Sequence, residues 1–132
     1  MLTLNVTTHR RCEFVDISRQ TAEFAREVGL REGAVIAFVP HTTAGITINE
    51  NADPDVTADM EAALERAVPW TAGYAHAEGN AAAHVKASMM GSSVTVLVKN
   101  GELQLGTWQA VYFAEFDGPR TRKVWLRAIA EG

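Results

Sequence analysis

The sequence predicts a single α+β domain over residues 1–132, with a largely antiparallel sheet or sandwich and about three helices. Many segments alternate apolar and polar residues with the period of two that is typical of half-buried strands. Three other segments carry start and stop signals of helices. Most predicted strands follow one another through short turns, which favours antiparallel pairing. The length of 132 residues is that of one domain.

The first segments predict two strands and a helix. Apolar residues alternate in 2–7, and 14–17 is a second short apolar run, so the chain is expected to open with a hairpin around a turn at 9–11. Ser18 is the expected N-cap of the following helix, and Gly29 is its expected stop. The apolar face of this helix is expected to contain Ala22, Ala25 and Val28.

The next segment, 34–39, is continuously apolar and is bounded by Gly33 and Pro40, which predicts a central strand covered on both faces. A further strand is expected over 46–49. Asp53 and Pro54 then mark a helix start, with Asp53 as the cap. The helix ends before Pro69, and its core-facing stripe is expected to comprise Val56, Met60, Ala63, Leu64 and Ala67.

The second half predicts one helix followed by strands. The helix covers 80–90, with Asn80 as its cap and Gly91 as its stop. A strand over 94–98 leads into Asn100-Gly101, which favours a type I′ hairpin turn, and the partner strand is expected to continue through Leu105. Two further strands are expected, at 110–116 and 121–130.

Composition excludes several classes of protein. The net charge is −4, which argues against a general nucleic-acid binder. No apolar run approaches the ~20 residues that span a bilayer, and the N-terminus does not resemble a signal peptide. The single Cys12 cannot form an internal disulfide. We therefore expect a cytoplasmic protein with neither a nucleic-acid nor a membrane partner.

Three of the four histidines lie in polar stretches. His41 follows the buried strand, and His76 and His84 flank Glu78 and Asn80. Three imidazoles with carboxylates nearby suit a divalent metal, most simply zinc, with one position left open. Glu78 could then act as a general base or orient an imidazole. The helix start at Asn80 could receive a phosphate or carboxylate.

Spacing leaves other interpretations open. His76 and His84 are eight residues apart, unlike the i, i+4 pair of a His-Glu-x-x-His helix. His76-Ala77-Glu78 matches the His-x-Glu of zinc deaminases, but the Pro-Cys-x-x-Cys segment of those enzymes is missing. Each histidine taken alone is more typical of an ordinary hydrogen-bonded side chain than of a metal ligand, and Asp53 is more typical of a helix cap than of a catalytic group.

Several motifs closely resemble the YjbQ-like family, whose members are sometimes labelled secondary thiamine-phosphate synthases. The resemblance covers nearly the whole chain, in order and at similar spacing. The matching segments are His41-Thr42-Thr43-Ala44-Gly45-Ile46-Thr47-Ile48-Asn49-Glu50-Asn51, Asp53-Pro54-Asp55-Val56, His76-Ala77-Glu78-Gly79-Asn80, Ala83-His84-Val85-Lys86, Gly106-Thr107-Trp108-Gln109 and Glu115-Phe116-Asp117-Gly118-Pro119-Arg120.

The resemblance implies an α+β fold that assembles as a homotrimer, with a polar pocket near the subunit contacts. It implies that His41, His76 and His84 hold a divalent metal, often zinc. It also implies weak thiamine-phosphate synthase activity, in which a phosphorylated hydroxyethylthiazole joins a pyrimidine diphosphate and pyrophosphate is lost.

We therefore expect a small metal-binding enzyme that acts on an anionic, phosphorylated substrate. The expected catalytic residues are Glu78, Asn51 and Arg120, and the expected substrate-binding residues are Thr42, Thr43, Asn80 and Asp53. Two alternatives stay open. One is a non-catalytic trimeric module that binds a metabolite and uses the metal structurally. The other is a metal-assisted phosphoester hydrolase.

Overall fold

The computed structural model describes all 132 residues and contains two antiparallel sheets and three helices, which confirms the α+β class. The five-stranded sheet has the order β1 (Leu2–Thr7), β8 (Thr121–Ala130), β3 (Gly33–Phe38), β5 (Ser93–Lys99) and β6 (Glu102–Leu103). The three-stranded sheet has the order β2 (Glu13–Asp16), β7 (Gln109–Glu115) and β4 (Ala44–Glu50). The helices are α1 (Ser18–Glu27), α2 (Pro54–Ala67) and α3 (Ala81–Met90).

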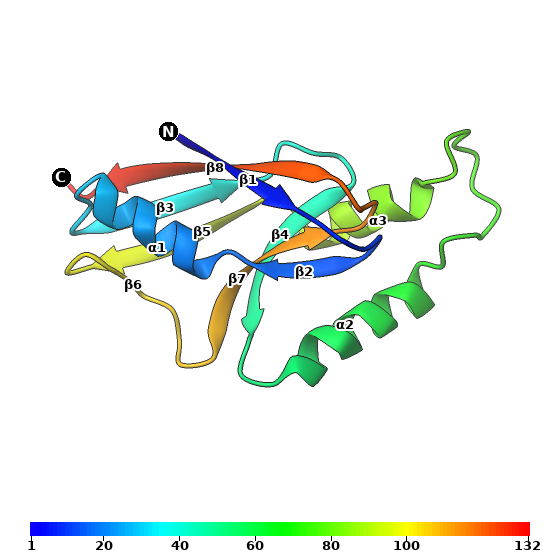
Figure 1. Cartoon of the computed structure of the whole chain (residues 1–132), viewed down its shortest axis with the longest axis horizontal. Helices are drawn as coiled ribbons and strands as arrows, with labels where there is room; N and C mark the ends of the chain where they lie inside the picture. Colours follow the sequence, from blue (N-terminus) through cyan, green and yellow to red (C-terminus); the bar gives the residue numbers. More distant parts are fainter.

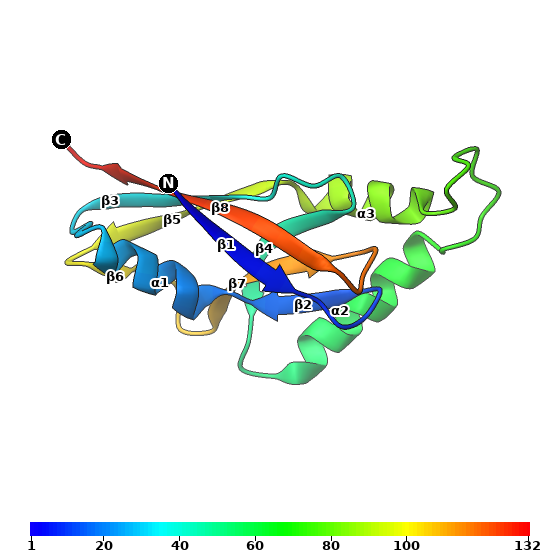
Figure 2. The ribbon, with the colours of Figure 1, turned by 45° about the horizontal axis from the view of Figure 1, so that its top comes forward.

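The main core lies between the inner faces of the two sheets (Figures 1 and 2). Val35 and Val124 contribute from the five-stranded sheet, Ile46 and Phe113 from the three-stranded sheet, and Phe24 from α1. All five are buried. Burial of apolar side chains is the main force that stabilises such a layer.

A second, smaller apolar cluster joins α3 to the other side of the three-stranded sheet. It contains Ala83 and Ala87 of α3 together with Ala114 and Phe116. The helix sits close because β4 has a glycine at its contact: a Cβ on Gly45 would lie 2.7 Å from the carbonyl oxygen of Gly91. This close packing fixes the position of α3, and with it the backbone of His84.

The predicted opening hairpin is wrong. β1 pairs with β8 and β2 pairs with β7, so the two strands belong to different sheets. Both partners lie near the end of the chain. Alternating apolar residues identified each strand, but alternation does not specify which strand will be the partner.

Four further local predictions need correction. β3 is central in its sheet but buried on one face only, because Phe38 on the outer face is 40% exposed. On α1 the buried residues are Thr21, Phe24 and Ala25, and Val28 is exposed. Ser18 does not cap α1; its hydroxyl instead accepts a hydrogen bond from the Val111 backbone N–H. The partner strand of the second hairpin is also shorter than expected, since β6 ends at Leu103.

One predicted turn and one predicted helix cap are confirmed. Asn100 and Gly101 both have positive φ angles, 53° and 78°, between β5 and β6, as a type I′ turn requires. Asp53 caps α2 by accepting a hydrogen bond from the Asp55 backbone N–H at 2.9 Å. Asn80 occupies the cap position of α3, but its side chain makes no capping bond.

The predicted core-facing stripe of α2 is only partly buried. No residue of α2 is fully buried, but Leu64 packs against the small apolar cluster of α3, and the helix projects from the sheets in Figure 1. Ion pairs attach it as well. Arg10 forms a bidentate ion pair with Glu61, with N–O distances of 3.0 and 3.1 Å. The ammonium of the buried Lys86 lies 2.9 Å from the Glu65 carboxylate. The helix is therefore attached by ion pairs together with the apolar contact of Leu64.

We expect the amide hydrogens of α2 to exchange with solvent faster than those of α3, and faster still in 1 M salt. Exposed ion pairs are screened at that ionic strength, whereas the alanine packing of α3 is not. Hydrogen–deuterium exchange at low and high salt measures this. Exchange in α2 that is equal to that of α3 and insensitive to salt would contradict attachment by charge.

None of the three helices combines the length and the apolar composition needed to cross a membrane.

Candidate functional site: a polar cavity at the junction of the sheets

A polar cavity of about 480 Å³ opens where β3, β7, β8 and α3 end or begin. It is lined by Pro40, His41, Thr42, Thr43, His76, Glu78, Asn80, His84, Asp117, Arg120 and Arg122. His41 and His84 also line an adjoining cavity of about 520 Å³. Apart from Pro40, every side chain of the first cavity can donate or accept a hydrogen bond.

His41 is held at the end of β3 by a strand of the same sheet. Its Nε2 accepts a hydrogen bond from the Lys123 backbone N–H at 2.9 Å. Burial lowers the pKa of His41, and the nearby positive charge of Arg122 lowers it further. The neutral ring therefore carries its proton on Nδ1, where it is available as a donor.

The rings of the other two histidines lie edge to face beside the cavity. The rings of His76 and His84 lie 5.3 Å apart, centre to centre, and nearly perpendicular. Glu78 lies 4.0 Å from His76 Nε2. His84 stands on α3, whereas His76 and Glu78 belong to the long segment between α2 and α3, at the far right of Figure 1.

A buried ion pair closes the inner end of the cavity. Arg122 donates to Glu115 through both Nε and Nη2, and Glu115 also accepts from the Thr8 hydroxyl and the Asp117 backbone N–H. Burial raises the pKa of Glu115, but its hydrogen bonds from Arg122, Asp117 and Thr8 outweigh burial and hold that pKa below its ordinary value. Glu115 is thus ionised in the folded chain at neutral pH.

Asp117 connects the helix side of the cavity to the strand side. Its Oδ2 accepts from Asn80 Nδ2 at 2.9 Å and from Arg120 Nη2 at 3.1 Å. The carbonyl oxygen of the Asn80 side chain is buried and has no hydrogen-bond partner. Such an atom is costly to bury alone, so the site has an acceptor ready for a donor.

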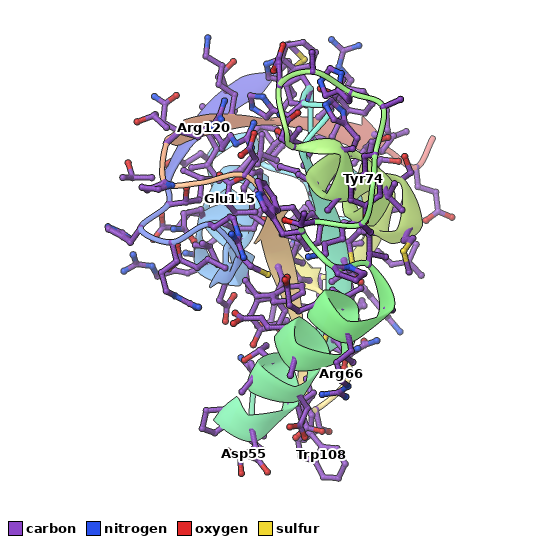
Figure 3. The ribbon with its side chains drawn as sticks, turned by 90° about the vertical axis from the view of Figure 1, so that its right-hand side faces the viewer. Asp55, Arg66, Tyr74, Trp108, Glu115 and Arg120 are labelled. Carbon is purple, nitrogen blue, oxygen red and sulfur yellow. The ribbon has the colours of Figure 1, made fainter.

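Two residues predicted for the site lie elsewhere in this chain. Asn51 follows the opposite end of β4, where its side chain donates to Asp16 and its backbone N–H to Trp108. Asp53 caps α2. Figure 3 shows the same separation: Asp55 and Trp108 lie at the bottom, far from Glu115 and Arg120. Neither Asn51 nor Asp53 lines the cavity.

The sequence did not lead us to predict Glu115 or Asp117 for the site, and it indicated Arg122 only as one of several basic residues near the C-terminus that could meet an anionic small molecule. Two signals were present. Glu115 interrupts an otherwise apolar strand, and a buried carboxylate needs a cation beside it. Arg120 and Arg122 are two apart near a strand start, so they point toward the same side.

The histidines do not form a metal site as they are placed. No three His, Cys, Asp or Glu side chains group closely enough to hold a metal ion. The Nε2 of His41 is also engaged by Lys123. The donor set matches the chemistry of zinc, but coordination would require His41 to leave Lys123 and the three rings to converge on one point.

The fold and the cavity together define a class: small α+β proteins whose two antiparallel sheets meet at a cavity of histidines, arginines and carboxylates. The family model described as UPF0047 protein YjbQ-like matches residues 2–131. The chain belongs to this UPF0047, or YjbQ-like, family.

Relatives are similar along nearly the whole chain. The UPF0047 protein YugU of Bacillus subtilis is 52% identical over 128 residues, covering 96% of this chain and 97% of that protein. A crystal structure of an uncharacterised conserved protein of the family from Clostridium acetobutylicum is 49% identical, with a TM-score of 0.96, covering 98% of this chain and 100% of that one. A conserved hypothetical protein from Thermus thermophilus is 40% identical, with a TM-score of 0.90 and coverages of 98% and 100%.

Proposed function

We propose that the chain is an enzyme that acts on phosphorylated small molecules, and that thiamine-phosphate synthesis is the reaction to test first. The observation that carries this proposal is the lining of the cavity. It combines three imidazoles, two guanidinium groups and two carboxylates without an apolar wall. Such a lining favours a small, charged, multiply hydrogen-bonded ligand.

In that reaction the thiazole nitrogen attacks the pyrimidine methylene carbon, and the carbon–oxygen bond to pyrophosphate breaks. Pyrophosphate leaves with the electron pair. Arg120 would attract the leaving group, and the hydroxyls of Thr42 and Thr43, with the remaining N–H of the Asn80 amide, would donate to the phosphates and orient them. Glu78 lies at the mouth of the cavity, where it would act as a base or orient His76.

The test supplies both substrates to purified protein and measures thiamine phosphate and pyrophosphate in equal amounts. We expect Arg120→Gln to lower the rate, because a cation that stabilises developing negative charge is lost. Val28→Glu, an exposed position outside the cavity, serves as the control. Phosphate release from simple esters, without thiamine phosphate, would favour the hydrolase alternative. No turnover of either kind would favour a binding module.

We further propose that zinc is the metal of this site and that His41, His76 and His84 are its ligands. We expect protein purified without an affinity tag to contain about one zinc per chain and His76→Ala/His84→Ala to contain none. His9→Ala is the matched control, because His9 is exposed and does not line the cavity. Wild-type protein that stays metal-free after zinc is offered would assign the histidines to hydrogen bonding or proton transfer.

The outer face of the five-stranded sheet supports a homotrimer. Phe38 and Trp125 stack there at 5.9 Å, and Leu97 and Ile129 are 64% and 48% exposed. The register places Ala34 directly between Leu97 and Ile129. An apolar sheet face of this kind is typical of a protein contact, and we propose that further copies of the chain cover it.

We expect a mass of three chains in analytical ultracentrifugation at micromolar concentration. Leu97→Glu/Ile129→Glu should shift the mass toward one chain, because burying unpaired carboxylates in a contact is unfavourable. Val28→Glu is again the control, since Val28 is the exposed C-cap residue of α1 and does not belong to the five-stranded sheet. A wild-type mass of one chain would contradict the trimer.

A further inference from the structure

Arg122 combines deep burial with access to the cavity. It lies on β8 among residues whose side chains alternate between the core and the outer face, and its neighbours on the inner face are Val124 and Leu126. Only 3% of Arg122 is exposed, yet it lines the polar cavity. A guanidinium in this position is expensive to desolvate unless its hydrogen bonds are made.

Two of its three nitrogens are fully engaged. Nε donates to Glu115 Oε1 at 2.8 Å, and Nη2 donates to Glu115 Oε2 and to the Thr43 hydroxyl at 2.8 Å. Nη1 donates to no protein atom, but it is not sealed from solvent. The two N–H groups of Nη1 therefore remain available at the cavity.

The surroundings hold this free end in one orientation. Glu115 is itself fixed by Thr8 and by the Asp117 backbone N–H, and Thr43 is buried beside it. Arg120 contrasts with Arg122: its side chain is 50% exposed, and it is bonded to the carbonyl oxygen and carboxylate of Asp117. A desolvated, oriented donor binds an anion more strongly than a solvated one.

We propose that Arg122, rather than Arg120, is the primary anion receptor of this cavity, and that its Nη1 donates to oxygen atoms of a phosphoryl group. This inference deepens the proposed function and rests on it for the class of ligand. Glu115 then has a second role besides stability: it orients Arg122 and keeps the empty cavity from carrying a bare buried cation. Arg120, at the mouth, attracts the anion before it reaches Arg122.

The probe is inorganic pyrophosphate, and the measurement is isothermal titration calorimetry on the purified full-length chain. We expect Arg122→Lys to weaken binding roughly 10- to 100-fold, because a charge-assisted hydrogen bond contributes about 1.5–3 kcal/mol. Lysine keeps the charge beside Glu115 but provides no second nitrogen toward the cavity. Arg127→Gln, on the same strand but on the outer face, should leave binding unchanged.

A second variant tests whether a loss of pyrophosphate binding merely reflects misfolding of the protein. Glu115→Gln/Arg122→Met replaces both partners of the buried pair, so no charge is left unpaired, and it should also lose pyrophosphate binding while unfolding cooperatively. Arg120→Gln is expected to weaken binding less than Arg122→Lys does. The reverse order would overturn the inference, as would the absence of binding by wild-type protein.

The same calorimetric titration distinguishes a failure of this inference from a failure of the proposed function. If Arg122→Lys binds as wild type does and His76→Ala/His84→Ala does not bind, the histidine site holds the anion. The inference then fails and the proposed function stands. If Arg122→Lys loses binding but wild-type protein produces no thiamine phosphate and hydrolyses no ester, the receptor is real and the proposed enzyme is wrong.

Discussion

Glu115→Ala is expected to lower the free energy of unfolding by about 3–5 kcal/mol, because it leaves the guanidinium of Arg122 buried without a counter-charge. Arg122 is 3% exposed and Glu115 is fully buried, so water cannot replace the lost carboxylate. Native domains are stable by only about 5–15 kcal/mol, so this single change removes a large part of the total. Urea unfolding followed by circular dichroism measures it.

Two comparisons test the cause. Glu115→Gln/Arg122→Met should recover much of the loss, because removing both charges avoids the desolvation penalty of one. The free energy of unfolding of the wild-type protein should also depend on pH through this ion pair. The pKa of Glu115 is held below its ordinary value of 4.5, so its contribution is complete above pH 4.5 and is lost as the pH falls through the folded-state pKa. A Glu115→Ala profile that falls in parallel with that of wild type in this range would contradict this assignment.

Phe113→Ala is expected to cost about 3–5 kcal/mol, because it removes a large, fully buried ring and leaves a cavity. Phe113 lies on the central strand of the three-stranded sheet, opposite Val15 of β2 and Ile46 of β4, and it faces the five-stranded sheet across the core. Its loss should weaken the contact between the two sheets. Urea unfolding again provides the measurement.

Phe113→Leu is the matched control and should cost less, since it leaves a smaller cavity. Tyr112 points away from the main core on the same strand, and its hydroxyl donates to the Glu50 carbonyl oxygen. Tyr112→Phe should therefore change stability by only about 0.5–1.5 kcal/mol. Equal losses for Phe113→Ala and Tyr112→Phe would mean that the core is not centred between the sheets.

The positions of strands and helices could be predicted because they depend on local pattern. Thr121–Ala130 is a strand with the predicted bounds, and Asn100-Gly101 forms the predicted turn. Strand pairing could not be predicted from local pattern, because β1 pairs with β8, which lies at the far end of the chain. The α2 stripe is borne out only in part for a related reason: Met60 and Leu64 have the period of a core helix and are half-buried, but periodicity does not identify how completely a stripe is covered.

The candidate site was predictable where its chemistry is concentrated in sequence. His41, His76, His84, Glu78 and Arg120 do lie around one cavity, together with Thr42, Thr43 and Asn80. Asn51 and Asp53 do not, because β4 carries them to its opposite end. The role of Arg122 could not be read from local sequence. It depends on contacts with Glu115 and Thr43, and Thr43 is 79 residues away.

One part of the cavity is built by residues on or beside packed strands and the other by residues on a connection between helices. This difference affects how the family could diversify. Arg122, Glu115 and Thr43 stand on or beside packed strands, so changing them would disturb the core. His76 and Glu78 stand on the connection between α2 and α3, and α2 has no fully buried residue. Connections of this kind accept substitutions and insertions readily. Evolution could therefore alter the residues 68–80 around the cavity while retaining the buried Arg122–Glu115 pair at its inner end.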